Sequence, residues 1–277
     1  MIFLLLAVLS SATISVIMRL SSHRVKANLS MLCANYLVCS VLGAAYAGFS
    51  LMPVGAEGFS GTAALGVLNG VLFLASFMLL QFNTRKNGIV LSSIFMKLGL
   101  LVPILMSVLF FHEMPTWLQL LGFCISVGAI LLINLQKDGL KGFSWELLLL
   151  LLLGGSADAM SKVYEVLGEP ALSNQFLFYT FVVALVLCSG LALLKKERPT
   201  FAELGFGFLI GIPNFFSSKF LLGALTSLPA VVVYPTFCVA TMLLVTLAGV
   251  CLFKERLPRR QWIALGAIIL ALVLLNI

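Results

Sequence analysis

The feature that most constrains this chain is an internal duplication. Residues 111–134 recur at 253–276 with a constant offset of 142 residues. Apolar matches are common in so hydrophobic a sequence, so the matching polar positions are the informative ones: Glu113 with Glu255, Gln119 with Gln261, and Asn134 with Asn276. Offsets of 141 and 143 align further residues: Gly66 and Gly70 with Gly207 and Gly211, and Arg19, Ser30 and Tyr36 with Lys162, Ser173 and Tyr179. A duplicated unit in a membrane protein is typical of secondary transporters.

Composition identifies the lipid bilayer as the solvent of this chain. Hydrophobic residues occupy 61% of the 277 positions and charged residues only 10%, whereas soluble domains have roughly 25% charged residues. Because backbone groups find no water in a bilayer, we expect each long apolar run to be a helix. There are ten such runs: 1–20, 30–50, 61–82, 88–111, 115–135, 144–166, 171–194, 203–223, 229–252 and 258–277. The first run lacks the basic start of a signal peptide, so we expect it to be retained.

The basic residues indicate how these helices are oriented. Of the 17 Lys and Arg residues, the following lie in the loops after odd-numbered runs: Arg24, Lys26, Arg85, Lys86, Lys137, Lys141, Lys195, Lys196, Arg198, Lys254, Arg256, Arg259 and Arg260. The positive-inside rule then places these loops in the cytoplasm and both termini outside. Each predicted repeat, residues 1–136 and 143–277, contains five runs. Since five is odd, we predict an all-α integral membrane protein of ten transmembrane helices in two inverted five-helix repeats, with a substrate site where they meet.

The end of each repeat resembles the EamA-type branch of the drug/metabolite transporter superfamily. That branch closes each half with Glu, then Gln six residues later and Gly three beyond, which fits Glu113, Gln119 and Gly122. The second half keeps Glu255 and Gln261 but has Ala at position 264. The resemblance implies secondary transport of metabolites without a bound cofactor. Members of this branch usually keep both termini in the cytoplasm, the reverse of the orientation that the charges predict here.

Lys97 is the best candidate for a substrate-binding residue. In a helix starting near residue 88 it lies ~14 Å along a hydrocarbon core ~30 Å thick, close to the midplane. An ionisable group at that depth is expected to face a cavity or a partner. Its ammonium could hold a substrate carboxylate or phosphate, or it could be neutralised by a structural carboxylate. Ser93, one helical turn earlier, shares its face and is included in the candidate site.

Asp158 and Lys162 are candidates for proton coupling or for a structural ion pair. They are four residues apart on one predicted helix, so they share a face and can pair. Asp158 is the natural proton-coupling candidate because it is the carboxylate that lies deepest in an apolar run. Gly154 and Gly155, just before it, could permit close packing or a local opening of the helix. The sequence leaves both roles of the pair open.

Further candidates for substrate binding are polar residues in apolar runs. Asn214 and Ser218 share a face after Pro213, which breaks the backbone ladder and leaves a carbonyl that must find a partner or line a cavity. Tyr234, before Pro235, could stack on a ligand or simply pack. Asn69 is a weaker candidate for the same pocket. Lys219 could join the site or extend to the membrane surface, and Glu113 and Glu255 are expected to cap or brace the helix that follows each of them.

These observations predict a plasma-membrane secondary transporter that works by alternating access. Basic groups outnumber acids within the runs, so the expected substrate is an amino acid, an organic acid or another anionic or zwitterionic solute. The sequence has no phosphate-binding loop, HExxH or GxSxG motif, so we expect no enzyme activity, metal or cofactor, and no nucleic-acid partner. The expected partners are a small metabolite and the bilayer. The alternatives are a flippase for a lipid-linked sugar or a non-transporting membrane protein.

Overall fold

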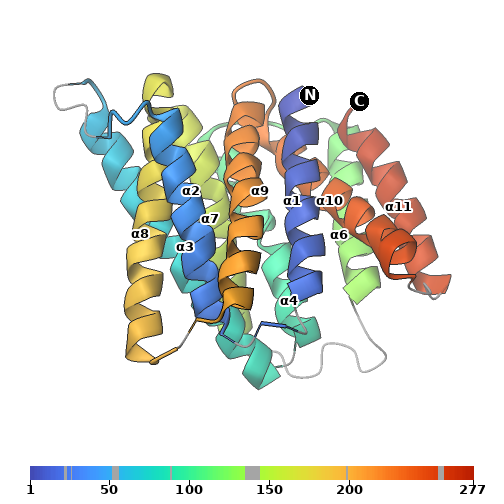
Figure 1. The fold of residues 1–277 in the computed structure, drawn as a ribbon. Helices are drawn as coiled ribbons and strands as arrows, with labels where there is room; N and C mark the ends of the chain where they lie inside the picture. Colours follow the sequence, from blue (N-terminus) through green and yellow to red (C-terminus); the bar gives the residue numbers. More distant parts are fainter. Residues whose placement is uncertain are drawn as a thin grey trace. The chain divides into compact units, whose positions relative to one another are not determined.

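The computed structural model describes residues 1–21, 24–25, 27–51, 56–87, 89–134, 144–197, 199–254 and 259–277, and over these residues the chain is helical without strands. The helices, of which all but α5 and η1 are labelled in Figure 1, are α1 (Ile2–Ser21), α2 (Asn28–Tyr46), α3 (Phe59–Asn87), α4 (Ile89–Leu98), α5 (Leu101–Phe110), α6 (Trp117–Asn134), α7 (Trp145–Leu167), the 3₁₀ turn η1 (Pro170–Leu172), α8 (Ser173–Leu194), α9 (Phe201–Leu225), α10 (Ala230–Phe253) and α11 (Arg259–Leu275).

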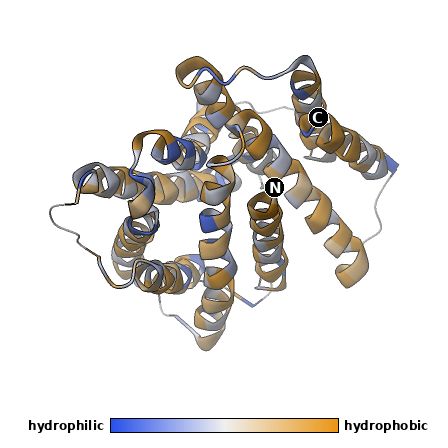
Figure 2. Cartoon of the chain, turned by 90° about the horizontal axis from the view of Figure 1, so that it is seen from above, coloured by the Kyte–Doolittle hydropathy of each residue, from blue (hydrophilic) through white to orange (hydrophobic). Residues whose placement is uncertain are grey.

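The helices coincide with the apolar runs predicted from the sequence. Among the described residues, seven helices are long and apolar enough to cross a membrane, and three shorter apolar helices span Phe95–Phe110, Trp117–Leu132 and Trp262–Leu275. Colouring by hydropathy shows long hydrophobic stretches along the helices (Figure 2). The run 88–111 differs, because the structure divides it into α4 and α5 rather than one helix.

The division between α4 and α5 follows from Pro103. Proline lacks the N–H that would bond to the carbonyl four residues earlier, and its ring clashes with that carbonyl. That carbonyl belongs to Gly99, which instead accepts a 2.9 Å bond from Val102 N–H. Gly155 of α7 lies against the break, since a Cβ built on it would fall 2.6 Å from Val102 Cβ. The Gly154-Gly155 pair therefore permits close packing, one of the two roles considered for it.

Contacts divide the chain into two compact units. Unit 1 comprises Met1, Ala75–Lys162 and Ala224–Ile277, and unit 2 comprises Ile2–Leu74 and Val163–Gly223. Each unit therefore contains helices from both of the predicted repeats. The boundaries between the units fall within α3 and α7 and at the end of α9.

In unit 2, glycines bring α3 onto α8 and α9 onto α2 in two matching arrangements. A Cβ on Gly70 of α3 would lie 2.6 Å from Thr180 O and 2.7 Å from Val183 Cβ of α8. A Cβ on Gly211 of α9 would lie 2.8 Å from Asn35 O and 2.6 Å from Val38 Cβ of α2. The same atom types meet each glycine.

The matching arrangement also shows which residues of α2 correspond to which residues of α8 in the two repeats. It relates Asn35 to Thr180 and Val38 to Val183, an offset of 145 residues. That is two residues more than the 143 by which the sequence aligns Ser30 with Ser173. Apolar helices contain few polar residues that could define an alignment, so matching the two sequences did not determine this offset to within two residues.

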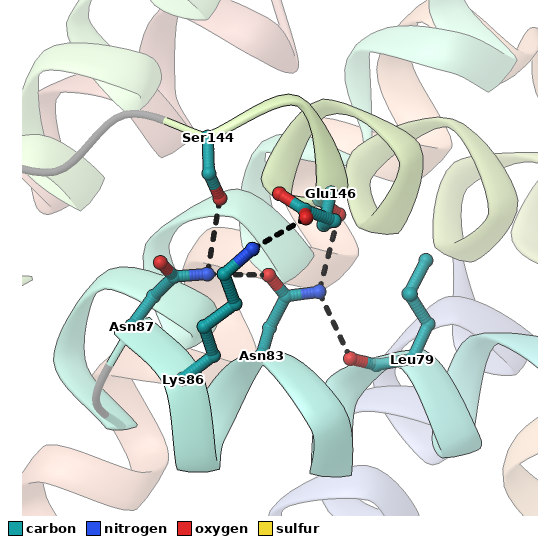
Figure 3. A network of polar contacts seen from close by, with 6 residues as sticks. All are labelled: Leu79, Asn83, Lys86, Asn87, Ser144 and Glu146. Carbon is teal, nitrogen blue, oxygen red and sulfur yellow. Dashed lines mark hydrogen bonds and ion pairs between the residues drawn. The ribbon is translucent and has the colours of Figure 1, made fainter.

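In unit 1, α6 packs against α11, the last helix of each predicted repeat. A Cβ on Gly122 would lie 3.0 Å from Leu274 Cβ, so the glycine of the family pattern is a packing residue. A second contact joins the end of α3 to the start of α7 (Figure 3): Asn83 donates to the carbonyls of Leu79 and Glu146, while Lys86 pairs with the Glu146 carboxylate at 2.5 Å.

The turns that follow α5 and α10 share one backbone conformation. His112 has φ of 55° and Lys254 has φ of 53°, both in the left-handed region, and the two residues are 142 positions apart. In each turn a backbone N–H bonds back to a carbonyl of the preceding helix: Glu113 to Ser107, and Lys254 to Gly249. The hydrogen bond in the turn after α5 thereby fixes the backbone position of Glu113, from which its side chain extends.

Candidate functional site

Three of the predicted site residues lie near one another in unit 1. The hydroxyl of Tyr234, on α10, donates a 2.8 Å hydrogen bond to the backbone carbonyl of Asp158, on α7. The charges of Lys97, on α4, and of Asp158 both act on the thiol of Cys238, one helical turn after Tyr234. Helices α4, α7 and α10 therefore bring a cation, a carboxylate and a phenol to one place.

These three side chains differ in their exposure. Tyr234 is buried, Lys97 is half-buried and Asp158 is exposed. An exposed carboxylate and a partly exposed ammonium can meet a solute or a proton, whereas the buried phenol fixes the spacing of α7 and α10. Ser93 lies in α4, but its side chain is outside the described residues.

The break after α4 shapes the surroundings of Lys97. Lys97 lies in the last turn of α4, where the carbonyl end of the helix dipole favours a cation. Helix α5 begins three residues beyond the end of α4 at Leu101, and a helix N-terminus favours an anion. The broken segment thus places two groups that favour negative charge, an ammonium and a helix N-terminus, within a few residues of each other.

Lys162 makes an ion pair with Glu113. Lys162 Nζ lies 2.7 Å from Glu113 Oε1, and both side chains are largely buried. Glu113 Oε2 accepts hydrogen bonds from Ser107 Oγ at 2.5 Å and from Ala230 N–H, the first residue of α10, at 2.7 Å. Burial works to raise the pKa of Glu113, but the contacts with Lys162, Ser107 and Ala230 outweigh it and hold that pKa below its ordinary value.

Glu113 was expected to cap or brace the following helix, and the capping role is wrong. Helix α6 begins instead with a capping box: Thr116 N–H donates to Gln119 Oε1 at 3.0 Å, and Gln119 N–H donates to Thr116 Oγ1 at 3.3 Å. Glu113 holds the N-terminus of α10, because the left-handed turn at His112 aims it there. Its counterpart Glu255 lies outside the described residues, as does the side chain of Gln261.

The ion pair described for Lys162 therefore uses a carboxylate that the sequence did not assign to it. Glu113 is 49 positions away in the chain, and no spacing rule relates the two residues. The pairing of Asp158 with Lys162 stays a prediction. The sequence analysis also assigned no role to Cys238, on whose thiol the charges of Lys97 and Asp158 both act.

Other predicted site residues lie in unit 2 and contact neutral partners. Asn214 of α9 donates from Nδ2 to Asn35 Oδ1 of α2 at 3.2 Å. Asn69 of α3 donates from Nδ2 to Thr180 Oγ1 of α8 at 3.3 Å, while its buried Oδ1 has no hydrogen-bond partner among the described residues. Ser218 is half-buried on α9. The amides of Asn214 and Asn69 thus form hydrogen bonds between helices, joining α9 to α2 and α3 to α8.

Lys219 lies against an aromatic ring. Its Nζ is 3.3 Å from the ring centroid of Tyr46 and 3.2 Å from Asn174 Oδ1. Asn174 Nδ2 also donates to the Tyr46 carbonyl at 3.1 Å. A cation over an aromatic face is attracted by the ring quadrupole. Lys219, on α9, therefore contacts the end of α2 and the start of α8.

The long apolar helices and the polar groups held among them define a multi-pass membrane protein of the transporter class. The model of the EamA-like transporter family matches residues 1–135 and again 142–277. The chain therefore belongs to the EamA-like transporter family, part of the drug/metabolite transporter superfamily. Members of this family are membrane transporters of small solutes and are not enzymes.

Individual proteins are also similar to this chain. A Haemophilus influenzae protein, described only as uncharacterised, is 25% identical over 203 residues, which cover 71% of this chain and 69% of the relative. One protein of known crystal structure superposes with a TM-score of 0.75 at 13% identity, covering 99% of this chain and 94% of the other. At that identity the superposition supports the fold alone.

Proposed function

We propose that this protein is a secondary active transporter that moves a small anionic or zwitterionic metabolite across the plasma membrane by alternating access. Amino acids and organic acids are the substrates that its charges fit best. The cluster of Lys97, Asp158 and Tyr234 in unit 1 is the observation that carries the proposal. Lys97 binds the substrate carboxylate, and Asp158 carries the coupling proton.

The chemistry around Lys97 supports an anionic group on the substrate. Placing an ammonium group inside a bilayer is unfavourable in free energy unless the group faces a water-filled cavity, a counter-ion or a ligand. In transporters, discontinuous helices commonly supply ion-binding groups near the midplane, with half-helix N-termini directed at anions. The α4–α5 break has that form, with Lys97 before it and Leu101 after it.

The reciprocal packing in unit 2 supports alternating access. Helix α3 meets α8 through Gly66 and Gly70, as α9 meets α2 through Gly207 and Gly211. Exchange of partners between two copies is what a two-fold relation produces. With five spans in each half, such a relation would invert one copy and give two equivalent states, one open to each side.

The substrate proposal is tested in proteoliposomes with a panel of labelled amino acids and organic acids. We expect Lys97→Ala to abolish uptake of the anionic solute, and Lys97→Arg, which keeps the positive charge, to retain part of it. Lys86→Ala, which removes an exposed cation elsewhere in unit 1, is the matched control. Unchanged uptake by a folded Lys97→Ala protein would remove this lysine from the mechanism.

The coupling proposal is tested with imposed pH gradients. A carboxylate that carries the proton is needed for gradient-driven uptake but not for substrate exchange, so Asp158→Asn should lose the first and keep the second. Loss of both would make Asp158 a binding or structural residue.

Two further measurements address the remaining expectations. Reporter fusions at each terminus test whether both lie outside the plasma membrane. Flipping of a fluorescent lipid-linked sugar in the same vesicles, with no metabolite uptake, would favour the flippase alternative.

A further inference from the structure

An apolar groove runs between α2, α8 and α9 in unit 2. It has a volume of about 680 Å³, within the range of about 300–1,000 Å³ typical of ligand pockets. Its walls are mainly aliphatic and aromatic: Leu37, Leu185, Leu193, Leu204 and Phe208. Such a lining suits a hydrocarbon chain and offers little to a polar metabolite.

The groove opens on the outside of the unit. Leu37, Leu193 and Phe208 line it and remain 44%, 78% and 48% exposed. In a soluble protein these side chains would face water. In a membrane protein, exposed apolar side chains on long helices face lipid. The opening of the groove is therefore in contact with the acyl chains of the bilayer.

One end of the groove is polar, at the C-terminal end of α8. Glu197 lines it, and Glu197 Oε2 accepts bonds from Ser30 N–H at 3.1 Å and from Ser30 Oγ at 3.2 Å. The left-handed backbone of Lys196, with φ of 52°, turns the chain so that Glu197 N–H bonds to Ala192 O at 3.1 Å. Lys195 and Lys196 are both exposed at this turn.

We propose that this groove binds one phospholipid molecule of the bilayer. One acyl chain lies between α2, α8 and α9, and the lipid phosphate meets the ammonium groups of Lys195 and Lys196. Glu197, at the same end, favours a head group that carries an amine, as phosphatidylethanolamine does. The site lies within unit 2 and does not depend on the proposed transport function.

Native mass spectrometry of the delipidated protein, titrated with phosphatidylethanolamine, tests the proposal. The wild type should bind one molecule tightly. Lys195→Ala and Lys196→Ala should each weaken binding by up to about fivefold, because one exposed contact between opposite charges contributes up to about 1 kcal/mol. Diacylglycerol with the same acyl chains, which lacks the phosphate and the amine, should bind weakly. Diacylglycerol binding as tight as that of the phospholipid would overturn the proposal.

A second pair of variants separates the groove from general lipid contact. Ala192→Trp places an indole in the groove and should remove the bound lipid. Val186→Trp is the matched control, because Val186 is 63% exposed on the same helix and does not line the groove. Both variants should keep the melting temperature of the wild type. Equal lipid binding by the two variants would place the lipid elsewhere.

Cys33 gives an independent readout because its thiol lines the groove. Bound phosphatidylethanolamine should slow the reaction of Cys33 with a maleimide, measured by peptide mass spectrometry. Cys124 is exposed in unit 1 and serves as an internal control whose rate should not change. Protection of both thiols alike, or of neither, would contradict a lipid seated in this groove.

Discussion

Glycines allow close helix packing in both units of this protein, and unit 1 adds a buried ion pair. In unit 1, a buried ion pair between Lys162 and Glu113 joins α7 to the turn before α6, and the same carboxylate binds the first N–H of α10. In unit 2, helices meet through glycines, as at Gly70 and Gly211, with neutral amides such as Asn35 crossing between them.

The comparison shows which features are common to both repeats and which occur in only one of them. The glycine contacts occur twice with the same atoms, so both halves use the same packing. The charged cluster of Lys97 and Asp158 does not follow the duplication: with the offsets of 142 and 143 that hold in these two regions, their counterparts are Val239 and Ser15. Packing is thus a shared property of the halves, whereas the candidate chemistry belongs to single positions.

The largest effect is expected from Glu113→Gln in unit 1. Glutamine keeps an oxygen acceptor for Ser107 or Ala230 but leaves the Lys162 ammonium without its carboxylate. Removing one partner of a buried ion pair costs about 3–5 kcal/mol. Chemical unfolding of the purified protein in detergent measures this loss.

The double variant Glu113→Gln/Lys162→Met is the control for charge. It removes both charges together, so it should recover most of the lost stability. A double variant as unstable as Glu113→Gln alone would show that the hydrogen bonds, and not the ion pair, hold unit 1 together.

Acid should weaken the same contact. The pKa of Glu113 lies below its ordinary value of 4.5 in the folded protein, so its contribution to stability is complete above that value. The contribution is lost as the pH falls through the lowered folded pKa. Thermal unfolding between pH 7 and pH 3 should show this loss in the wild type and a smaller one in Glu113→Gln. Identical profiles would contradict it.

A smaller loss is expected from Gly211→Ala in unit 2. The new methyl group would lie 2.6 Å from Val38 Cβ and 2.8 Å from Asn35 O, and overpacking of this kind typically costs about 1–3 kcal/mol. Gly70→Ala should lose a similar amount, since the reciprocal contact has the same form. Gly205→Ala, on the same helix with nothing within 4 Å of the new Cβ, should be neutral or stabilising. Destabilisation by all three would indicate a general helix effect instead of close packing.

The sequence predicted the helices well because apolar runs of spanning length are a strong signal. It missed the break at Gly99, although Pro103 was visible, because an apolar run can contain a proline without ending. Within the candidate site, Lys97, Asp158 and Tyr234 were found as polar residues in apolar surroundings. The partner of Lys162 was missed because a contact between distant turns depends on backbone direction, here set by the left-handed residue at 112.

A loss of about 1 kcal/mol is expected from Thr116→Ala, which removes the hydroxyl of the capping box at the start of α6. Gln119→Ala removes the other half of the box and should cost a similar amount. Because the two side chains act on the same helix end, the double variant should lose less than the two single losses added together. Full additivity, measured by chemical unfolding, would show that the two bonds act separately.

The smallest effect is expected from Lys86→Ala, and it decides whether charge or burial distinguishes the units. Lys86 pairs with Glu146 at 2.5 Å, but its side chain is 48% exposed, and an exposed ion pair contributes little to stability. Asn83, fully buried in the same contact, donates to the Glu146 carbonyl and accepts from Asn87 Nδ2, and each lost hydrogen bond costs about 0.5–1.5 kcal/mol. Asn83→Ala should therefore destabilise the protein more than Lys86→Ala in the same unfolding assay. The reverse order would mean that unit 1 depends on its charges wherever they lie, and that the strength of the Lys162–Glu113 pair does not come from its burial.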